Sequence, residues 1–232
     1  LIVGGYVMVG AILTNNSPVT LDKVTPIARL TGEYETIVVP AASDIKDMAG
    51  LVEKLKADPG AVSWAGGSAG GVDHITAGLI AKAVGVDPTK VNYIAFSGGG
   101  EALAAILGGQ VTVGISGYGE FESQIKAGQL RIIGISSDEK VEGIDAPTFK
   151  EAGVDVAIQN WRMVAAAPGI SDEQKAAVNA DIDKMVHSET WKKTLADKGW
   201  ADTYLAGDDF AKQLKADTDS TGAILKDIGL VK

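Results

Sequence analysis

The chain has 232 residues, of which 46% are hydrophobic and 22% charged, a composition typical of a globular protein with one large or two small domains. Its net charge is −9, and no cluster of Lys and Arg could neutralise a nucleic acid or an anionic membrane surface. The absence of cysteine excludes disulfides, thiolate metal ligands and cysteine nucleophiles, and no run approaches the ~20 apolar residues of a membrane helix.

Up to Pro168, short β-branched runs alternate with segments of helical periodicity, which predicts βα units around a mainly parallel sheet. We expect strands at Thr36–Val39, Val62–Ala65, Val91–Phe96, Val111–Ser116, Leu130–Ser136 and Arg162–Ala166. Helices are expected from Ser43-Asp44 to Pro59-Gly60 and over Val72–Val84, Glu101–Leu107, Glu120–Ala127 and Thr148–Ala152.

After Pro168 the pattern predicts nearly continuous helix. A capping box at Ser171–Gln174 opens a helix that runs to about Val186, and Glu189–Lys198 and Asp208–Ile228 follow. Their charged residues lie on one face, which is typical of helices that cover a sheet.

Glycine accounts for 29 of the 232 residues, and the excess falls in Ala65–Gly71, Ser97–Gly100 and Ile115–Gly119. Each cluster follows an expected strand and precedes an expected helix, whose first turn offers unpaired N–H groups and the positive end of the helix dipole. In an open α/β sheet such junctions lie where ligands bind, so three converging turns predict a site for carboxylates. The alternative is that the glycines only close tight turns. Neither a G-x-G-x-x-G nor a G-x-x-x-x-G-K-[ST] pattern is present, so a nucleotide site is not expected.

Few side chains are candidates for chemistry. His74 falls in the first turn of a helix, where its ring either donates to a ligand or braces the preceding loop, and we favour bracing. Together with Asp73 it supplies too few ligands for a metal. His187 is expected at a solvated helix end, and Arg162 is either a carboxylate partner beside Trp161 or a surface residue.

Gly66–Gly70 reads G-x-S-x-G with Ser68 at the nucleophile position, which keeps an α/β hydrolase as an alternative. The pattern is weakened by the lack of a suitably placed histidine base, since His187 is the sole histidine far downstream.

Several segments, in their order and spacing, resemble the periplasmic solute-binding proteins of tripartite tricarboxylate transporters, the Bug family, over essentially the whole chain. They are Ala65–Gly71 with His74 and Gly78, Tyr93–Leu103, Leu107–Val111, Ile125–Arg131, Ala146–Thr148, Glu151–Val154, Trp161 and Ala167–Gly169. The resemblance implies a two-lobed, type II periplasmic-binding-protein α/β fold, the Venus flytrap, in which each lobe is a mixed sheet flanked by helices. It further implies a periplasmic monomer, its signal peptide removed, that performs no catalysis and uses no cofactor or metal. Such a protein holds a small carboxylate through backbone amides and delivers it to membrane permease subunits.

Phe96–Glu101 and Asn160–Arg162 are most similar to the branch of the family associated with citrate and other tricarboxylates. A binding component of a periplasmic sensor is a further alternative. We expect residues 1–39 with 161–232 to form one lobe and 40–160 the other, joined by crossing strands at Thr36–Pro40 and Asn160–Ala166. Leu1–Gly10 is similar to a later strand and turn of the first lobe, so that lobe is expected to lack its opening segment. The expected ligand-binding residues are Gly5, Ser68, Ala69, Gly70, Gly71, His74, Ser97, Gly98, Gly99, Tyr118 and Arg162.

Overall fold

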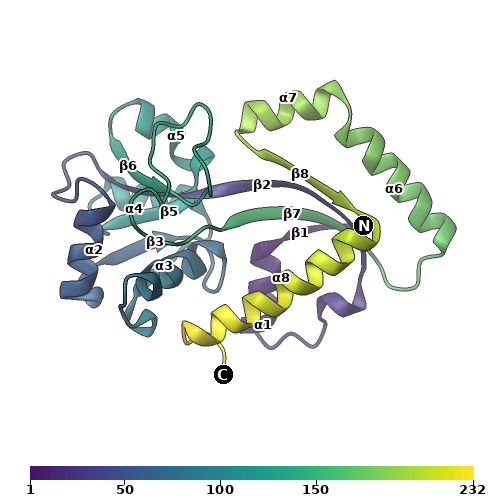
Figure 1. The fold of residues 1–232 in the computed structure, drawn as a ribbon, viewed down its shortest axis with the longest axis horizontal. Coiled ribbons are helices and arrows are strands. Elements are labelled where there is room, and N and C mark those ends of the chain that lie inside the picture. Colours follow the sequence, from purple (N-terminus) through teal and green to yellow (C-terminus); the bar gives the residue numbers. More distant parts are fainter. The chain divides into compact units, whose positions relative to one another are not determined.

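The computed structural model describes residues 1–232 and divides them into two compact units (Figure 1). Unit 1 comprises Leu1–Glu33 and Asn160–Ala223, and unit 2 comprises Tyr34–Gln159 and Ile224–Lys232. The chain passes from one unit to the other inside β2 (Thr25–Pro40), at the start of β7 (Gln159–Ala166) and inside α8 (Gly207–Asp227).

The lobes expected from the sequence differ from these units in their bounds, most clearly at the C-terminus. The last nine residues group with unit 2 because they pack on α3 (Val72–Ala83). A Cβ on Gly78 would lie 2.8 Å from the side chain of Ile228, and Lys82 Nζ pairs with Asp227 Oδ2 at 2.5 Å. The expected division into lobes itself stays a prediction.

Unit 2 is built on a mixed sheet in the order β6-β2-β5-β3-β4. β3, β4 and β5 run parallel, and β2 lies antiparallel to both β5 and β6. The elements are α2 (Met48–Ala57), β3 (Ser63–Gly66), α3, β4 (Asn92–Ala95), α4 (Gly99–Leu107), β5 (Val113–Gly117), α5 (Tyr118–Lys126) and β6 (Leu130–Ile135), with 3₁₀ turns at Pro59–Ala61 and Pro88–Lys90.

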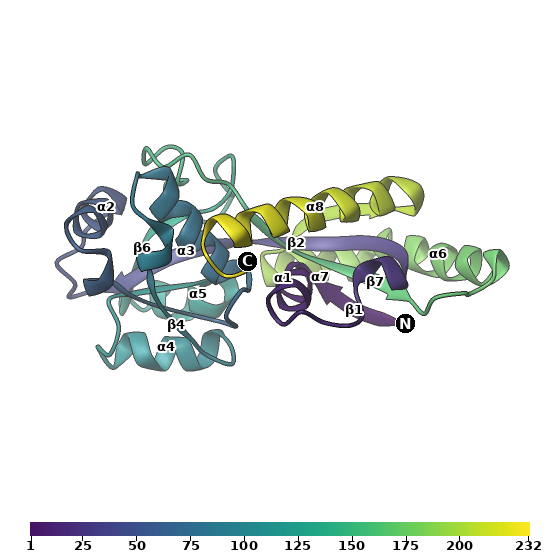
Figure 2. The same ribbon diagram turned by 90° about the horizontal axis from the view of Figure 1, so that it is seen from below.

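Alternating side chains of these strands pack on helices at both faces of the sheet. Ile37 and Val39 belong to a core with α2 and α3, whereas Val38 belongs to a second core with α4 and α5. Trp64 and Ala65 divide in the same way, as the two-residue period of a strand requires. Figure 2 shows the two helix pairs on either side of the strands, so the turns between strands and helices are left at the edges of the sheet.

Unit 1 is built on a sheet in the order β1-β7-β2-β8, in which β1 (Ile2–Gly5) is antiparallel to β7 and β8 (Ala201–Ala206) to β2. Its helices are α1 (Tyr6–Thr14), α6 (Asp172–Val186), α7 (Glu189–Lys198) and most of α8, with a 3₁₀ turn at Leu21–Lys23. Ile27 and Val164 lie in a core that α6 and α7 cover. The expected capping box at Ser171 and Gln174 is confirmed. No helix is long and apolar enough to cross a membrane.

Several expected elements are corrected by the structure. Thr148–Ala152 forms turns rather than a helix, because Gly153 at φ +84° reverses the chain after a single turn. The segment after Pro168 is not continuous helix, since β8 separates α7 from α8. Likewise Tyr6–Thr14 is a helix where a turn was expected, and α2 begins at Met48, capped by Asp47, rather than at Ser43.

Candidate functional site

Three strand-to-helix turns meet at one edge of unit 2. β4, β3 and β5 are neighbours in the sheet and parallel, and each leads into a helix, α4, α3 and α5 respectively. Because parallel strands end at the same edge of a sheet, the turns at residues 66–71, 97–99 and 117–118 lie on that edge. The structure thus brings the three glycine clusters together, and their role in ligand binding stays a prediction.

The turn at residues 66–71 reverses the chain tightly at Ser68. The Gly71 N–H donates to Ser68 O at 2.9 Å, and Gly70 has a φ of +74°. This bond and this φ fit a type II turn, with Ala69 second and Gly70 third, where a positive φ favours glycine. Ser68 and Ala69 are exposed, and their N–H groups donate to no acceptor in the chain. The turn before α3 therefore carries two backbone donors, on exposed residues, that are not used within the chain.

Gly67 is held on both sides by side chains. Its N–H donates to Asp73 Oδ2 at 2.6 Å, and its carbonyl oxygen accepts a hydrogen bond from Tyr93 Oη at 2.8 Å. At the preceding residue, a Cβ on Gly66 would lie 2.4 Å from Tyr93 Oη. The end of β3 thus needs glycine so that the Tyr93 hydroxyl can reach the turn.

His74 braces the far end of the same turn, which is the role that the sequence analysis favoured. Its Nδ1 accepts a hydrogen bond from the Gly70 N–H at 3.3 Å, and its ring stacks on Tyr93 with centroids 4.1 Å apart. Burial lowers the pKa of His74 to about 4, so the imidazole is neutral at neutral pH. Since Nδ1 accepts, the proton of the neutral ring is on Nε2.

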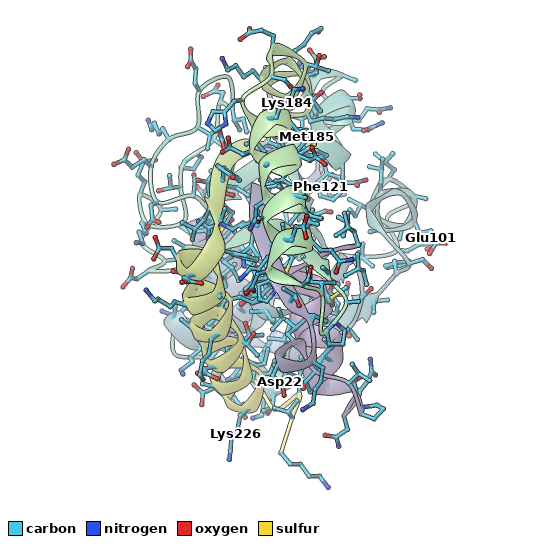
Figure 3. The ribbon with its side chains drawn as sticks, turned by 90° about the vertical axis from the view of Figure 1, so that its right-hand side faces the viewer. Asp22, Glu101, Phe121, Lys184, Met185 and Lys226 are labelled. Atoms are coloured by element: carbon cyan, nitrogen blue, oxygen red, sulfur yellow. The ribbon has the colours of Figure 1, made fainter.

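The second turn already has carboxylates of the chain beside it. The Ser97 N–H donates to Glu101 Oε2 at 3.1 Å, and a Cβ on Gly99 would lie 2.7 Å from Glu120 Oε2. Glu101 is exposed on the outside of α4 (Figure 3). Gly98 has an extended φ of 176°, and a Cβ there would meet nothing within 4 Å. The packing of the chain therefore explains glycine at position 99 but not at position 98.

The third turn carries Tyr118 at the first position of α5. This side chain is half-buried, and burial is the main cause that raises the pKa of Tyr118, so its hydroxyl is a donor at neutral pH. Gly117 pairs with Glu35 of β2 across the sheet, and Glu35 is fully buried.

Burial raises the pKa of Tyr93, and the charges of Asp73 and Glu35 raise it further.

The two remaining expected residues, Gly5 and Arg162, belong to unit 1 and are paired with each other across β1 and β7. Arg162 Nη2 forms an ion pair with Glu33 Oε1 at 3.1 Å, and the guanidinium also donates to the side chain of Asn160. A Cβ on Gly5 would lie 2.2 Å from Trp161 O. The close approach of the two strands thus explains glycine at position 5 without a ligand, and Arg162 already has an acidic partner.

Ser68, at the nucleophile position of the G-x-S-x-G match, has no general base beside it. No side chain that could act as a general base is hydrogen-bonded to Ser68, since His74 accepts from Gly70 and His187 contacts Asp183 O at the exposed end of α6. No group of three or more His, Asp or Glu side chains could hold a metal ion.

Sequence reasoning missed four side chains that lie against these turns: Asp73, Tyr93, Glu101 and Glu120. A signal existed for Asp73, because an acidic residue in the first turn of a helix is a common acceptor for the preceding N–H groups. Tyr93 and Glu120 gave none, since each reaches a turn that follows a different strand.

Comparisons with known proteins agree with this architecture. The chain is 22% identical to a crystallised TctC solute-binding protein from Polaromonas, with a TM-score of 0.76 over 97% of this chain and 76% of that one. It is 21% identical to MatC from Rhodopseudomonas palustris with bound malate, with a TM-score of 0.79 over 96% of this chain and 78% of that one. These likenesses confirm the expected α/β periplasmic-binding-protein fold.

Among curated proteins, a UPF0065 protein of Cupriavidus necator is 24% identical over 209 residues, which are 89% of this chain and 62% of that protein. The chain thus spans less than two thirds of this relative's length. The family model described as "Tripartite tricarboxylate transporter family receptor" (TctC) matches residues 11–230, and the members of this family are solute-binding receptors rather than enzymes. The chain belongs to the tripartite tricarboxylate transporter receptor family.

Proposed function

We propose that this protein captures a small carboxylate in the periplasm and delivers it to the membrane subunits of a tripartite tricarboxylate transporter. The observation that carries the proposal is the turn at residues 66–71, where the amides of two exposed residues, Ser68 and Ala69, donate to no acceptor in the chain, in a chain of this receptor family.

Backbone amides suit a carboxylate ligand here for an electrostatic reason. The chain carries a net charge of −9, so its overall field repels an anion and local donors have to capture it. The turn lies at the N-terminus of α3, where the helix dipole is positive. A hydrogen bond from a backbone N–H to a charged acceptor contributes about 1.5–3 kcal/mol.

The ligand we propose is citrate or another di- or tricarboxylate, bound by the protein as a monomer. A relative of similar fold is described with bound malate, which supports this chemical class. We propose that Arg162 selects for a second or third carboxylate group, since a guanidinium is the usual partner of a carboxylate. Its five donors allow a ligand oxygen to bind while Glu33 remains in place.

The proposal is tested by the substitution Ala69→Pro, which removes one of the two unbonded amide N–H groups. Proline fits the second position of a type II turn, so the ligand-free protein should keep its stability to within about 1 kcal/mol. Affinity for citrate or malate, measured by calorimetry, should fall by about 10-fold or more, the equivalent of one charge-assisted hydrogen bond.

Ser68→Ala is the matched control, because it removes a neighbouring side chain and leaves both amides intact. It should lower affinity much less than Ala69→Pro. If the wild-type protein binds none of the di- and tricarboxylates offered, the proposed function is wrong. If Ser68→Ala is the more damaging of the two, capture by backbone amides is wrong.

A further inference from the structure

Tyr93 reaches the turn at residues 66–71 from a neighbouring strand. It lies on β4, which is parallel to β3, and its hydroxyl donates to Gly67 O at 2.8 Å. The Gly67 N–H is meanwhile held by Asp73 Oδ2 at 2.6 Å. The two peptide groups on either side of the Gly67 Cα are therefore both fixed, and the second of them carries the Ser68 N–H.

The same aromatic ring supports the other end of the turn. Tyr93 stacks on His74 with an angle of 3° between the rings, and His74 Nδ1 accepts from the Gly70 N–H. One stacked pair thus contacts residues on both sides of Ser68 and Ala69. Burial raises the pKa of Tyr93, so its hydroxyl is protonated and available as a donor at neutral pH.

We propose that Tyr93 is a positioning residue, which holds the 66–71 turn in the conformation that aims the Ser68 and Ala69 amides at the ligand. This inference rests on the proposed function. It has a physical basis, because a loop held in its bound conformation loses less conformational entropy when the ligand binds. Tyr93 need not touch the ligand for this role, since it acts through the carbonyl of Gly67.

The test is Tyr93→Phe, which removes the hydroxyl and keeps the ring on His74. Hydrogen exchange of the ligand-free protein should become about 3- to 10-fold faster at the amides of Gly67, Gly70 and Gly71, the equivalent of one lost hydrogen bond. The amide of Ile75, which donates to Gly71 O inside α3, should exchange as in the wild type. Affinity for malate should fall by about 3- to 10-fold.

Tyr204→Phe is the matched control, because it removes a tyrosine hydroxyl that bonds Asp183 in unit 1, and it should change neither readout at the turn. Unchanged exchange at the turn in Tyr93→Phe would overturn the inference, as would faster exchange with unchanged malate affinity. If wild-type protein binds neither malate nor citrate, the proposed function fails, and the exchange rates alone then decide whether Tyr93 holds the turn.

Discussion

Replacing Gly66 by alanine probes the contact on which the turn depends. The added Cβ would lie 2.4 Å from Tyr93 Oη and 2.9 Å from Asp73 Cβ, about 1 Å inside normal contact. Tyr93 has to move, and its bond to Gly67 is then lost. The lost bond costs about 0.5–1.5 kcal/mol and the overpacking about 1–3 kcal/mol. We therefore expect Gly66→Ala to lower the free energy of unfolding by about 2–4 kcal/mol.

For a chain of 232 residues, this loss corresponds to a fall in Tm of roughly 5–15 °C, which scanning calorimetry resolves. The double variant Gly66→Ala/Tyr93→Phe identifies the cause of the lost stability, because it removes the hydroxyl oxygen with which the new methyl group clashes. In that background Gly66→Ala should cost at least about 1 kcal/mol less than in the wild type. A cost below about 0.5 kcal/mol, or an equal cost in both backgrounds, would refute the reasoning. Gly98→Ala is the control, since a Cβ there meets nothing within 4 Å.

Two further predictions concern His74 and Arg162. Burial lowers the pKa of His74 from 6.5 to about 4, so as pH falls the imidazole is protonated in the unfolded chain before it is protonated in the folded one. The stability that His74 contributes is therefore complete above pH 6.5 and is lost as pH falls to about 4. After a discount for partial exposure, this loss of unfolding free energy is roughly 2 kcal/mol. In His74→Gln, the free energy of unfolding measured with urea should therefore depend less on pH between 6.5 and 4. The same pH dependence as in the wild type would contradict the assignment. Arg162→Gln should weaken citrate binding by about 1.5–3 kcal/mol and binding of a monocarboxylate much less. If calorimetry shows equal losses of affinity for both ligands, or no loss, Arg162 is not part of the site. Glu33→Gln is the control, because it also breaks the ion pair but keeps the guanidinium.

The sequence alone was sufficient for much of unit 2. Its strands are short apolar runs bounded by turn residues, and its helices begin after glycine or a capping side chain. Such signals are local, so α3 was expected to within one residue and the capping box of α6 to the residue. The family resemblance also led to the fold and the receptor family, which the comparisons confirm.

Unit 1 was harder to predict because its strands depend on distant partners. The first part of β2 carries Arg29 and Glu33 within its apolar pattern and is defined by pairing with β8, about 170 residues later. β8 has mostly half-buried residues, so its alternating pattern is too weak to predict a strand within the expected helical tail.

The sequence likewise predicted one part of the candidate site, and the tertiary structure decided the rest. Glycine clusters after apolar runs are visible in the sequence, and they were sufficient to predict where the turns lie. Which side chains lie against these turns from elsewhere in the fold was decided only by the tertiary structure, because Tyr93 reaches the Gly67 carbonyl from a neighbouring strand and Glu120 lies beside Gly99 from a neighbouring helix. Arg162 likewise meets Glu33, 129 positions away. Side-chain hydrogen bonds and ion pairs form between groups that the fold brings within about 3 Å, and a local pattern has no access to those distances.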